Sequence, residues 1–195
     1  MKLALARFIS FVLNPLFIIV VVPFFLIYRT TGDLFSAFNW TMYTILFLLI
    51  MGGFILYKVR QGTFTDYDVS KREQRPLLFL VSGVLAIVYL IGLSLLKAPS
   101  ILYAVTFGVI IAVILASIIN NWIKVSMHVS TITALLVSLA LIYGGFYYFL
   151  LLGIPLMGYI RVRAKRHTVP ETIAGAIFGM SLSIVMYLVI TSFLV

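Results

Sequence analysis

The stretch from Val129 to Ile160, VSTITALLVSLALIYGGFYYFLLLGIPLMGYI, carries no charged residue over 32 positions. As a single α-helix it would be about 48 Å long, whereas the hydrocarbon core of a bilayer is about 30 Å thick. Gly144 and Gly145 stand at its midpoint. We therefore predict a hairpin of two short helices, at about 129–143 and 146–160, that turns at the glycine pair. One long tilted helix is the alternative.

The composition places this hairpin in a membrane protein. Hydrophobic residues make up 64% of the 195 positions and charged residues only 10%, whereas soluble domains are nearer a quarter charged. We predict an all-α, polytopic transmembrane helix bundle of six to seven helical segments, in one domain spanning residues 1–195 and with no nucleic-acid partner. The remaining apolar runs are Phe8–Tyr28, Phe38–Tyr57, Leu77–Leu96, Ser100–Asn120 and Thr172–Val195.

Three short clusters, at 71–76, 124–128 and 161–171, combine charged and other polar residues. The two histidines of the chain, His128 and His167, each lie in one of them. Glu171 follows His167 by four residues, which is about one helical turn. A carboxylate there can fix the imidazole tautomer and leave the other ring nitrogen free to attack phosphorus, while His128 acts as the acid. We expect such a pair to act on a phosphate group.

Basic residues of the same clusters can supply the phosphate contacts. Arg75, Arg161 and either Lys71 or Arg72 form a cationic set, and arginine binds phosphate oxygens in a bidentate manner.

Two structural interpretations stand beside the chemical one. Thr168-Val169-Pro170-Glu171 has the pattern of a capping box at the start of the last helix. The cations can instead set the topology and hold anionic lipid head groups. Gly175 and Gly179, four residues apart, indicate close helix packing rather than chemistry.

The distribution of cations predicts the orientation in the membrane. With the hairpin in place, the N-terminus and the loops 58–76, 121–128 and 161–171 lie on one side and carry most of the lysines and arginines. The other side has only Arg29 and Lys97. Because positively charged loops stay in the cytoplasm, we expect the N-terminus and all three clusters to be cytoplasmic.

These residues resemble the motifs of the type 2 phosphatidic acid phosphatase superfamily, which includes lipid phosphate phosphatases and vanadium haloperoxidases. Its third motif, S-R-x5-H-x3-D, is matched by Arg161, His167 and Glu171, with Glu for Asp and isoleucine for the usual serine. The second motif, P-S-G-H, is matched by Ser126 and His128 within Val-Ser-Met-His.

The first motif of the superfamily, K-x6-R-P, keeps Arg75-Pro76, but Asp68 stands in the place of its lysine. Lys71 and Arg72 precede Arg75 by about one turn, so we expect them near the same helix face and able to substitute for the lysine.

The resemblance implies a phosphohydrolase that needs no metal or cofactor and forms a phosphohistidine at His167. It implies that Glu171 orients the nucleophile and that His128 is the acid. Arg75, Arg161, Ser126 and Lys71 or Arg72 would then hold phosphate. With little mass outside the bilayer, the expected substrate is a lipid phosphate: phosphatidic acid, phosphatidylglycerol phosphate, or a polyprenyl phosphate or diphosphate.

Three other functions stay open at this point. The chain can be a non-catalytic lipid-phosphate-binding or scaffold protein on a degenerate phosphatase fold. Asp66 and Asp68 beside basic residues are compatible with a prenyltransferase that binds diphosphate through magnesium. Transport is a weaker option, because the apolar stretches contain no ionisable residue at mid-span.

Overall fold

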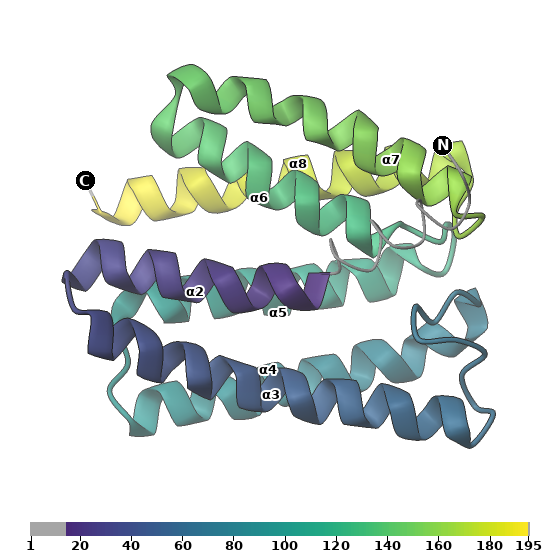
Figure 1. Ribbon diagram of the computed structural model, residues 1–195, viewed down its shortest axis with the longest axis horizontal. Helices are drawn as coiled ribbons and strands as arrows, with labels where there is room; N and C mark the ends of the chain where they lie inside the picture. Colours follow the sequence, from purple (N-terminus) through teal and green to yellow (C-terminus); the bar gives the residue numbers. More distant parts are fainter. Residues whose placement is uncertain (1–14, 195) are drawn as a thin grey trace. The chain divides into compact units, whose positions relative to one another are not determined.

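The computed structural model describes residues 15–194, and the side chains of all of these except 15–18, 21, 190 and 192–194. In this range every regular element is a helix, and five helical segments are long and apolar enough to cross a membrane (Figure 1). The predicted all-α helix bundle is thereby confirmed. Residues 19–122 form one compact unit and residues 123–194 another. That the chain folds as one domain stays a prediction.

The unit at 19–122 consists of helices joined by short links. Gly32, with φ of 69°, ends the first of them, and the Asp33 carboxylate caps the next by accepting from the amides of Phe35 and Ser36 at 2.9 and 3.1 Å. The helices are α2 (Pro15–Thr31), α3 (Leu34–Arg60), the short 3-10 helix η1 (Arg72–Gln74), α4 (Arg75–Leu95) and α5 (Ser100–Ile119).

The interior of this unit lies where α2, α3, α4 and α5 meet. Ile27, Ala37 and Leu93 are fully buried there. Tyr89 of α4 stacks against aromatic rings of α3, and its hydroxyl lies 2.9 Å from Thr44 Oγ1. The polar tips of the aromatic residues thus find partners inside an apolar helix pack, as buried tyrosines require.

The unit at 123–194 is built around the predicted hairpin. Its first arm is α6 (Met127–Tyr143), and its return arm consists of the 3-10 helix η2 (Gly145–Leu152) followed by α7 (Gly153–Arg163). The chain reverses at Gly144 and Gly145, whose φ angles of 61° and 51° lie in the left-handed region that glycine adopts without a side-chain clash. The hairpin prediction is confirmed, and the single long helix is excluded.

The return arm differs from the prediction in one respect, since its first eight residues are a 3-10 helix rather than an α-helix. A 3-10 helix rises about 2.0 Å per residue instead of 1.5 Å. The apolar side chains of this segment therefore cover a greater depth than the same residues would in an α-helix. Hydrophobic periodicity does not distinguish the two forms over so short a run.

The last helix, α8 (Val169–Leu194), packs closely against α6. A Cβ atom added at Gly175 would lie 2.8 Å from the Ser126 carbonyl oxygen, and one added at Gly179 would overlap the carbonyl oxygen of Ser130. One turn farther, Ser183 Oγ donates to the Ala134 carbonyl at 2.8 Å. The two glycines pack against the α6 backbone, which confirms their predicted role in helix packing.

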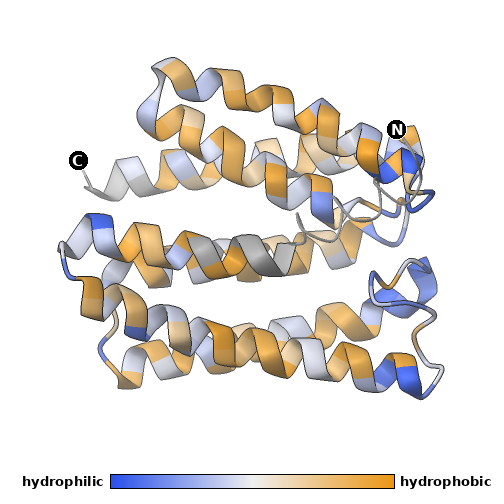
Figure 2. Cartoon of the chain, in the orientation of Figure 1, coloured by the Kyte–Doolittle hydropathy of each residue, from blue (hydrophilic) through white to orange (hydrophobic). Residues whose placement is uncertain are grey.

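The polar residues of each unit lie at helix ends and in the connecting loops, and the helix bodies are apolar (Figure 2). In the unit at 123–194, the loop between α7 and α8 meets the segment before α6, because the Ser126 amide donates to the Glu171 carbonyl at 3.2 Å. The second and third polar clusters therefore share one end of this unit.

Gly179→Ala is expected to lower the free energy of unfolding by about 1 to 3 kcal/mol, because the new methyl group forces α6 and α8 apart. Thermal unfolding in detergent measures the change. Gly53→Ala in α3 is the matched control, since its Cβ would meet nothing within 4 Å. That control should be neutral or stabilising, as alanine is the better helix former. Equal stability of the two variants would contradict the close approach.

Candidate functional site

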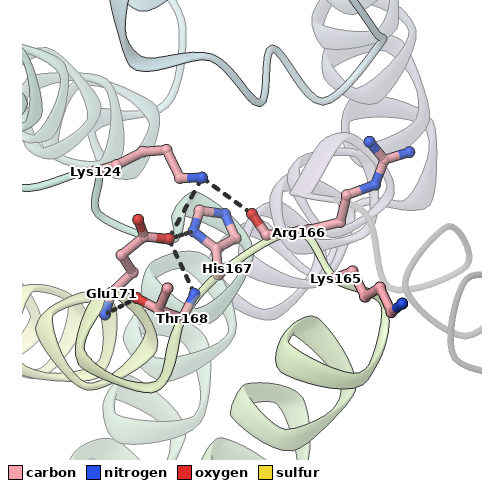
Figure 3. A pocket seen from close by; sticks show the side chains of 6 residues that line it. All are labelled: Lys124, Lys165, Arg166, His167, Thr168 and Glu171. Carbon is pink, nitrogen blue, oxygen red and sulfur yellow. Dashed lines mark hydrogen bonds and ion pairs between the residues drawn. The ribbon is translucent and has the colours of Figure 1, made fainter.

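His167 lies in the loop that leads into α8, two residues before the helix begins. Its Nδ1 atom is 2.8 Å from Glu171 Oε2, and its side chain is only 3% exposed (Figure 3). The predicted contact between the two residues is present. It does not come from one turn of regular helix, since only Glu171 is helical; the chain turns into the helix between them.

That turn is a complete capping box. The Thr168 amide donates to Glu171 Oε2 at 3.1 Å, and the Glu171 amide donates to Thr168 Oγ1 at 3.4 Å. Pro170 occupies the first turn of α8, where its missing N–H leaves no bond unmade. The capping and histidine-orienting interpretations are therefore both compatible with the geometry, because one carboxylate makes both sets of contacts.

The same hydrogen bonds assign the tautomer of His167. Glu171 Oε2 accepts from the Thr168 amide and pairs with the Lys124 ammonium at 3.4 Å, so it behaves as an ionised carboxylate oxygen. Its third neighbour, His167 Nδ1, must then carry a proton and donate it. In the neutral ring this leaves Nε2 without a proton, with its lone pair directed away from Glu171. A neutral Nε2 is the form that can attack phosphorus.

Lys124 opens the second polar cluster, and the sequence interpretation assigned it no individual role in the site. Besides its ion pair with Glu171, its ammonium donates to the carbonyl oxygen of Arg166 at 3.1 Å. Its position explains why it was missed: Lys124 precedes α6, and its partners lie 42 and 47 residues later in the chain. One local signal was available: Lys124, Ser126 and His128 stand at every second position of the same cluster.

His128 and Ser126 hold the start of α6 at the same end of this unit. Both are buried, with exposed fractions of 7% and 0%. Ser126 Oγ is buried and has no hydrogen-bond partner among residues 15–194. A buried hydroxyl without a partner is unusual in proteins and is often satisfied by a bound molecule. Ser126 does not line the cavity beside His167, and its contact with phosphate stays a prediction.

Arg161 lies in the last turn of α7 and is 2% exposed, the bulkiest fully buried side chain of the described residues. Its carbonyl oxygen accepts from the Arg166 amide at 3.1 Å, which closes the loop that carries His167. Lys165, between them, has φ of 58°. The left-handed conformation costs a residue with a side chain about 1 to 2 kcal/mol, so the bonds on either side must hold this turn.

A small open cavity of about 210 Å³ lies beside these residues. Three cations and the capping box form its wall, and Figure 3 shows His167 beside the Glu171 carboxylate at its centre. The lining residues are Lys124, Lys165, Arg166, His167, Thr168 and Glu171. Its cationic lining favours an anion, but Arg161, Ser126 and His128 are not among the lining residues.

The first cluster belongs to the other unit. Arg75 is the first residue of α4 and is 3% exposed, and its Nε donates to the Val69 carbonyl at 3.2 Å. Val69 itself has φ of 45°, which is rare for a β-branched residue. The carbonyl of the strained and buried Val69 therefore holds the Nε edge of the Arg75 guanidinium group.

Lys71 and Arg72 are exposed and precede α4 rather than belonging to it. Lys71 is extended, and the Arg72 guanidinium donates to the Trp122 carbonyl at 3.2 Å. Arg72 lies one 3-10 turn before Arg75, whose amide donates to the Arg72 carbonyl oxygen, whereas Lys71 lies outside that turn. That Arg75, Lys71 or Arg72 meets the phosphate held at His167 stays a prediction.

Asp66, the residue behind the prenyltransferase alternative, organises the loop before η1. Its Oδ1 accepts from the Asp68 amide and from Ser70 Oγ, both at 2.9 Å, and its carbonyl accepts from the Val69 amide. These contacts give the carboxylate a structural role in the turn that presents the Val69 carbonyl to Arg75.

Comparison with family models, with characterised proteins and with solved structures finds no match to this chain. The resemblance to phosphatase motifs therefore rests on the residues themselves.

The capping box yields a prediction about stability. Glu171→Ala should lower the free energy of unfolding by about 1 kcal/mol, because the Thr168 amide and the Lys124 ammonium lose their partner. Glu171→Gln should lower it by less, since an amide oxygen still accepts from Thr168. Chemical denaturation in detergent measures both. Glu73→Ala, at an exposed position of η1, is the control and should have no effect; a loss with Glu171→Gln as large as with Glu171→Ala would contradict the cap.

Proposed function

We propose that this protein is a membrane-embedded lipid phosphate phosphohydrolase that acts through a phosphohistidine at His167. The observation that carries the proposal is the 2.8 Å contact between His167 Nδ1 and Glu171 Oε2. It directs the unprotonated Nε2 away from the carboxylate, in a unit whose other charged residues are mostly cations. The combination of an oriented neutral imidazole with cations is suited to attack on a phosphoryl group.

The proposed reaction has two steps. His167 Nε2 forms a bond to phosphorus as the bond between phosphorus and the ester oxygen breaks, and His128 gives its proton to the departing lipid oxygen. A water molecule then loses a proton to His128 and attacks the phosphorus, and the bond between phosphorus and Nε2 breaks. Inorganic phosphate leaves, and both histidines return to their initial states. Glu171 stabilises the positive charge that the imidazole gains during attack.

Binding of the phosphate falls in this proposal to Arg161 and Ser126, with Arg75 and Lys71 or Arg72 added by the resemblance. The buried position of Arg161 supports this role, because a charge in a water-poor environment interacts more strongly with an anion than an exposed one does. The unpartnered hydroxyl of Ser126 supports it further.

The proposed substrate is a lipid, because the helices that carry the site are apolar and the polar residues are confined to their ends (Figure 2). A phosphatidic acid-like lipid and a polyprenyl phosphate or diphosphate share the chemistry that the site requires, namely a terminal phosphoryl group at the membrane surface. We further propose that the site faces the cytoplasm, on the strength of the excess of lysine and arginine in the loops beside it.

Purified protein is expected to release inorganic phosphate from lipid phosphates in excess EDTA, because histidine and cations perform the chemistry. Vanadate should inhibit by occupying the phosphate position. A panel of phosphatidic acid, phosphatidylglycerol phosphate and polyprenyl phosphate or diphosphate, assayed by released phosphate, measures this. Activity that disappears with EDTA and returns with magnesium would favour the prenyltransferase alternative, and binding without release would favour the non-catalytic one.

Variants of the three residues with proposed catalytic roles should fail in different ways. His167→Gln is expected to form no labelled phosphoenzyme from a ³²P-labelled lipid phosphate, since the nucleophile is gone. Glu171→Gln keeps the cap but removes the charge that stabilises the imidazolium, so turnover should fall by about 10²- to 10⁴-fold. His128→Gln should still form phosphoenzyme when the leaving group needs no proton. Equal and small effects of all three changes would indicate structural histidines and refute the proposal.

A further inference from the structure

Lys124 makes two contacts at the centre of the site, and the proposed reaction uses neither of them. Its ammonium lies 3.4 Å from Glu171 Oε2 and 3.1 Å from the Arg166 carbonyl oxygen. The Lys124 and Glu171 side chains are each only 18% exposed, so solvent screens the ion pair incompletely. Figure 3 shows the ammonium above the carboxylate, with the His167 ring beside the same oxygen.

The contact with Arg166 acts on the backbone that carries the nucleophile. The Arg166 carbonyl belongs to the peptide bond that leads into His167, and the Arg166 amide is already bound to the Arg161 carbonyl. The Arg161 carbonyl thus holds the peptide plane that follows the left-handed Lys165, and Lys124 holds the next plane, between Arg166 and His167. A strained turn held from both sides leaves the imidazole little freedom to rotate away from Glu171.

The contact with Glu171 acts on the charge of the imidazole. A carboxylate 2.8 Å from His167 favours a proton on both ring nitrogens, and a doubly protonated ring cannot attack. Lys124 and His167 contact the same oxygen at 3.4 and 2.8 Å, so Nζ and Nδ1 are no more than about 6 Å apart. A unit positive charge at that distance disfavours a second proton on the imidazole.

We infer that Lys124 is a positioning residue that offsets the Glu171 charge and holds the Arg166 peptide, so that His167 is neutral and correctly oriented in the resting protein. The inference rests on the proposed function for its catalytic meaning, but its effect on the imidazole is independent of any substrate. Glu171 can then both orient the ring and stabilise its positive charge during attack, without trapping it in the protonated state beforehand.

Lys124 is one of several charged or titratable groups around His167 within this unit. They come from every element packed at this end: the segment before α6, the start of α6, the end of α7 with its loop, and the start of α8. These groups are Lys124, His128, Arg161, Lys165, Arg166 and Glu171. The test must therefore remove one charge at a time.

The protonation of His167 can be followed directly by NMR. The chain has two histidines, so labelled imidazole gives two signals, and His128→Gln assigns them. Lys124→Met is expected to raise the pH at which half of His167 is protonated by about one unit. Lys165→Met is the matched control: Lys165 lines the same cavity, but Figure 3 shows its ammonium directed away from Glu171. The control should move the midpoint by less than half as much.

A chemical rescue separates charge from packing. The chain contains no cysteine, so Lys124→Cys creates a unique thiol, which bromoethylamine converts to a side chain with a terminal ammonium. The pH at which half of His167 is protonated should rise in the cysteine variant and return to the parent value after the modification. Lys124→Arg keeps the charge and serves as the test if the other variants do not fold. It should leave the protonation midpoint of His167 within about 0.3 pH unit of the parent. A shift in Lys124→Arg as large as in Lys124→Met, or none in Lys124→Met, overturns the inference.

An activity measurement then connects this effect to the proposed reaction. If the protein hydrolyses lipid phosphates, the acid limb of kcat/KM against pH should move upward in Lys124→Met by the same amount as the NMR midpoint. An unchanged acid limb together with a shifted midpoint would show that the proposed nucleophile is wrong while Lys124 still controls His167. An unchanged midpoint would show that the role of Lys124 is wrong, whatever the activity.

Discussion

The close approach of α6 and α8 is the constraint on which the candidate site depends. Without side chains at Gly175 and Gly179, the α8 helix lies against the α6 backbone, and the first turns of the two helices meet. Ser126 and His128 then lie at the same end as Glu171 and His167, although some 40 residues separate them in the chain. The hydrogen bond from the Ser126 amide to the Glu171 carbonyl fixes this register.

A single carboxylate oxygen links stability to chemistry at this end. Glu171 Oε2 receives the Thr168 amide, the imidazole of His167 and the ammonium of Lys124. The first contact completes a helix terminus, the second selects a tautomer, and the third neutralises part of the charge. Sites of this kind are sensitive to small displacements, because a shift of the cap moves the histidine at the same time.

The sequence sufficed for the helical architecture and for the His167–Glu171 contact, but not for contacts between distant segments. Charge-free runs gave the helices, and the pair Gly144-Gly145 gave the reversal, since both signals are local. The His167–Glu171 contact was also predictable, because four residues separate them. By contrast, the role of Lys124 depends on a tertiary contact. The helical spacing held for Arg72 but not for Lys71, which is extended before η1.

The short first arm of the hairpin has a consequence for the bilayer around it. At 17 residues, α6 extends only about 25 Å, less than the roughly 30 Å of hydrocarbon that a typical membrane presents. Hydrophobic mismatch of this sign draws the adjacent leaflets closer together. A bilayer that accommodates so short a helix thins beside it. The first turn of α6, where His128 is buried, then lies nearer to the membrane surface than in a helix that spans the full thickness.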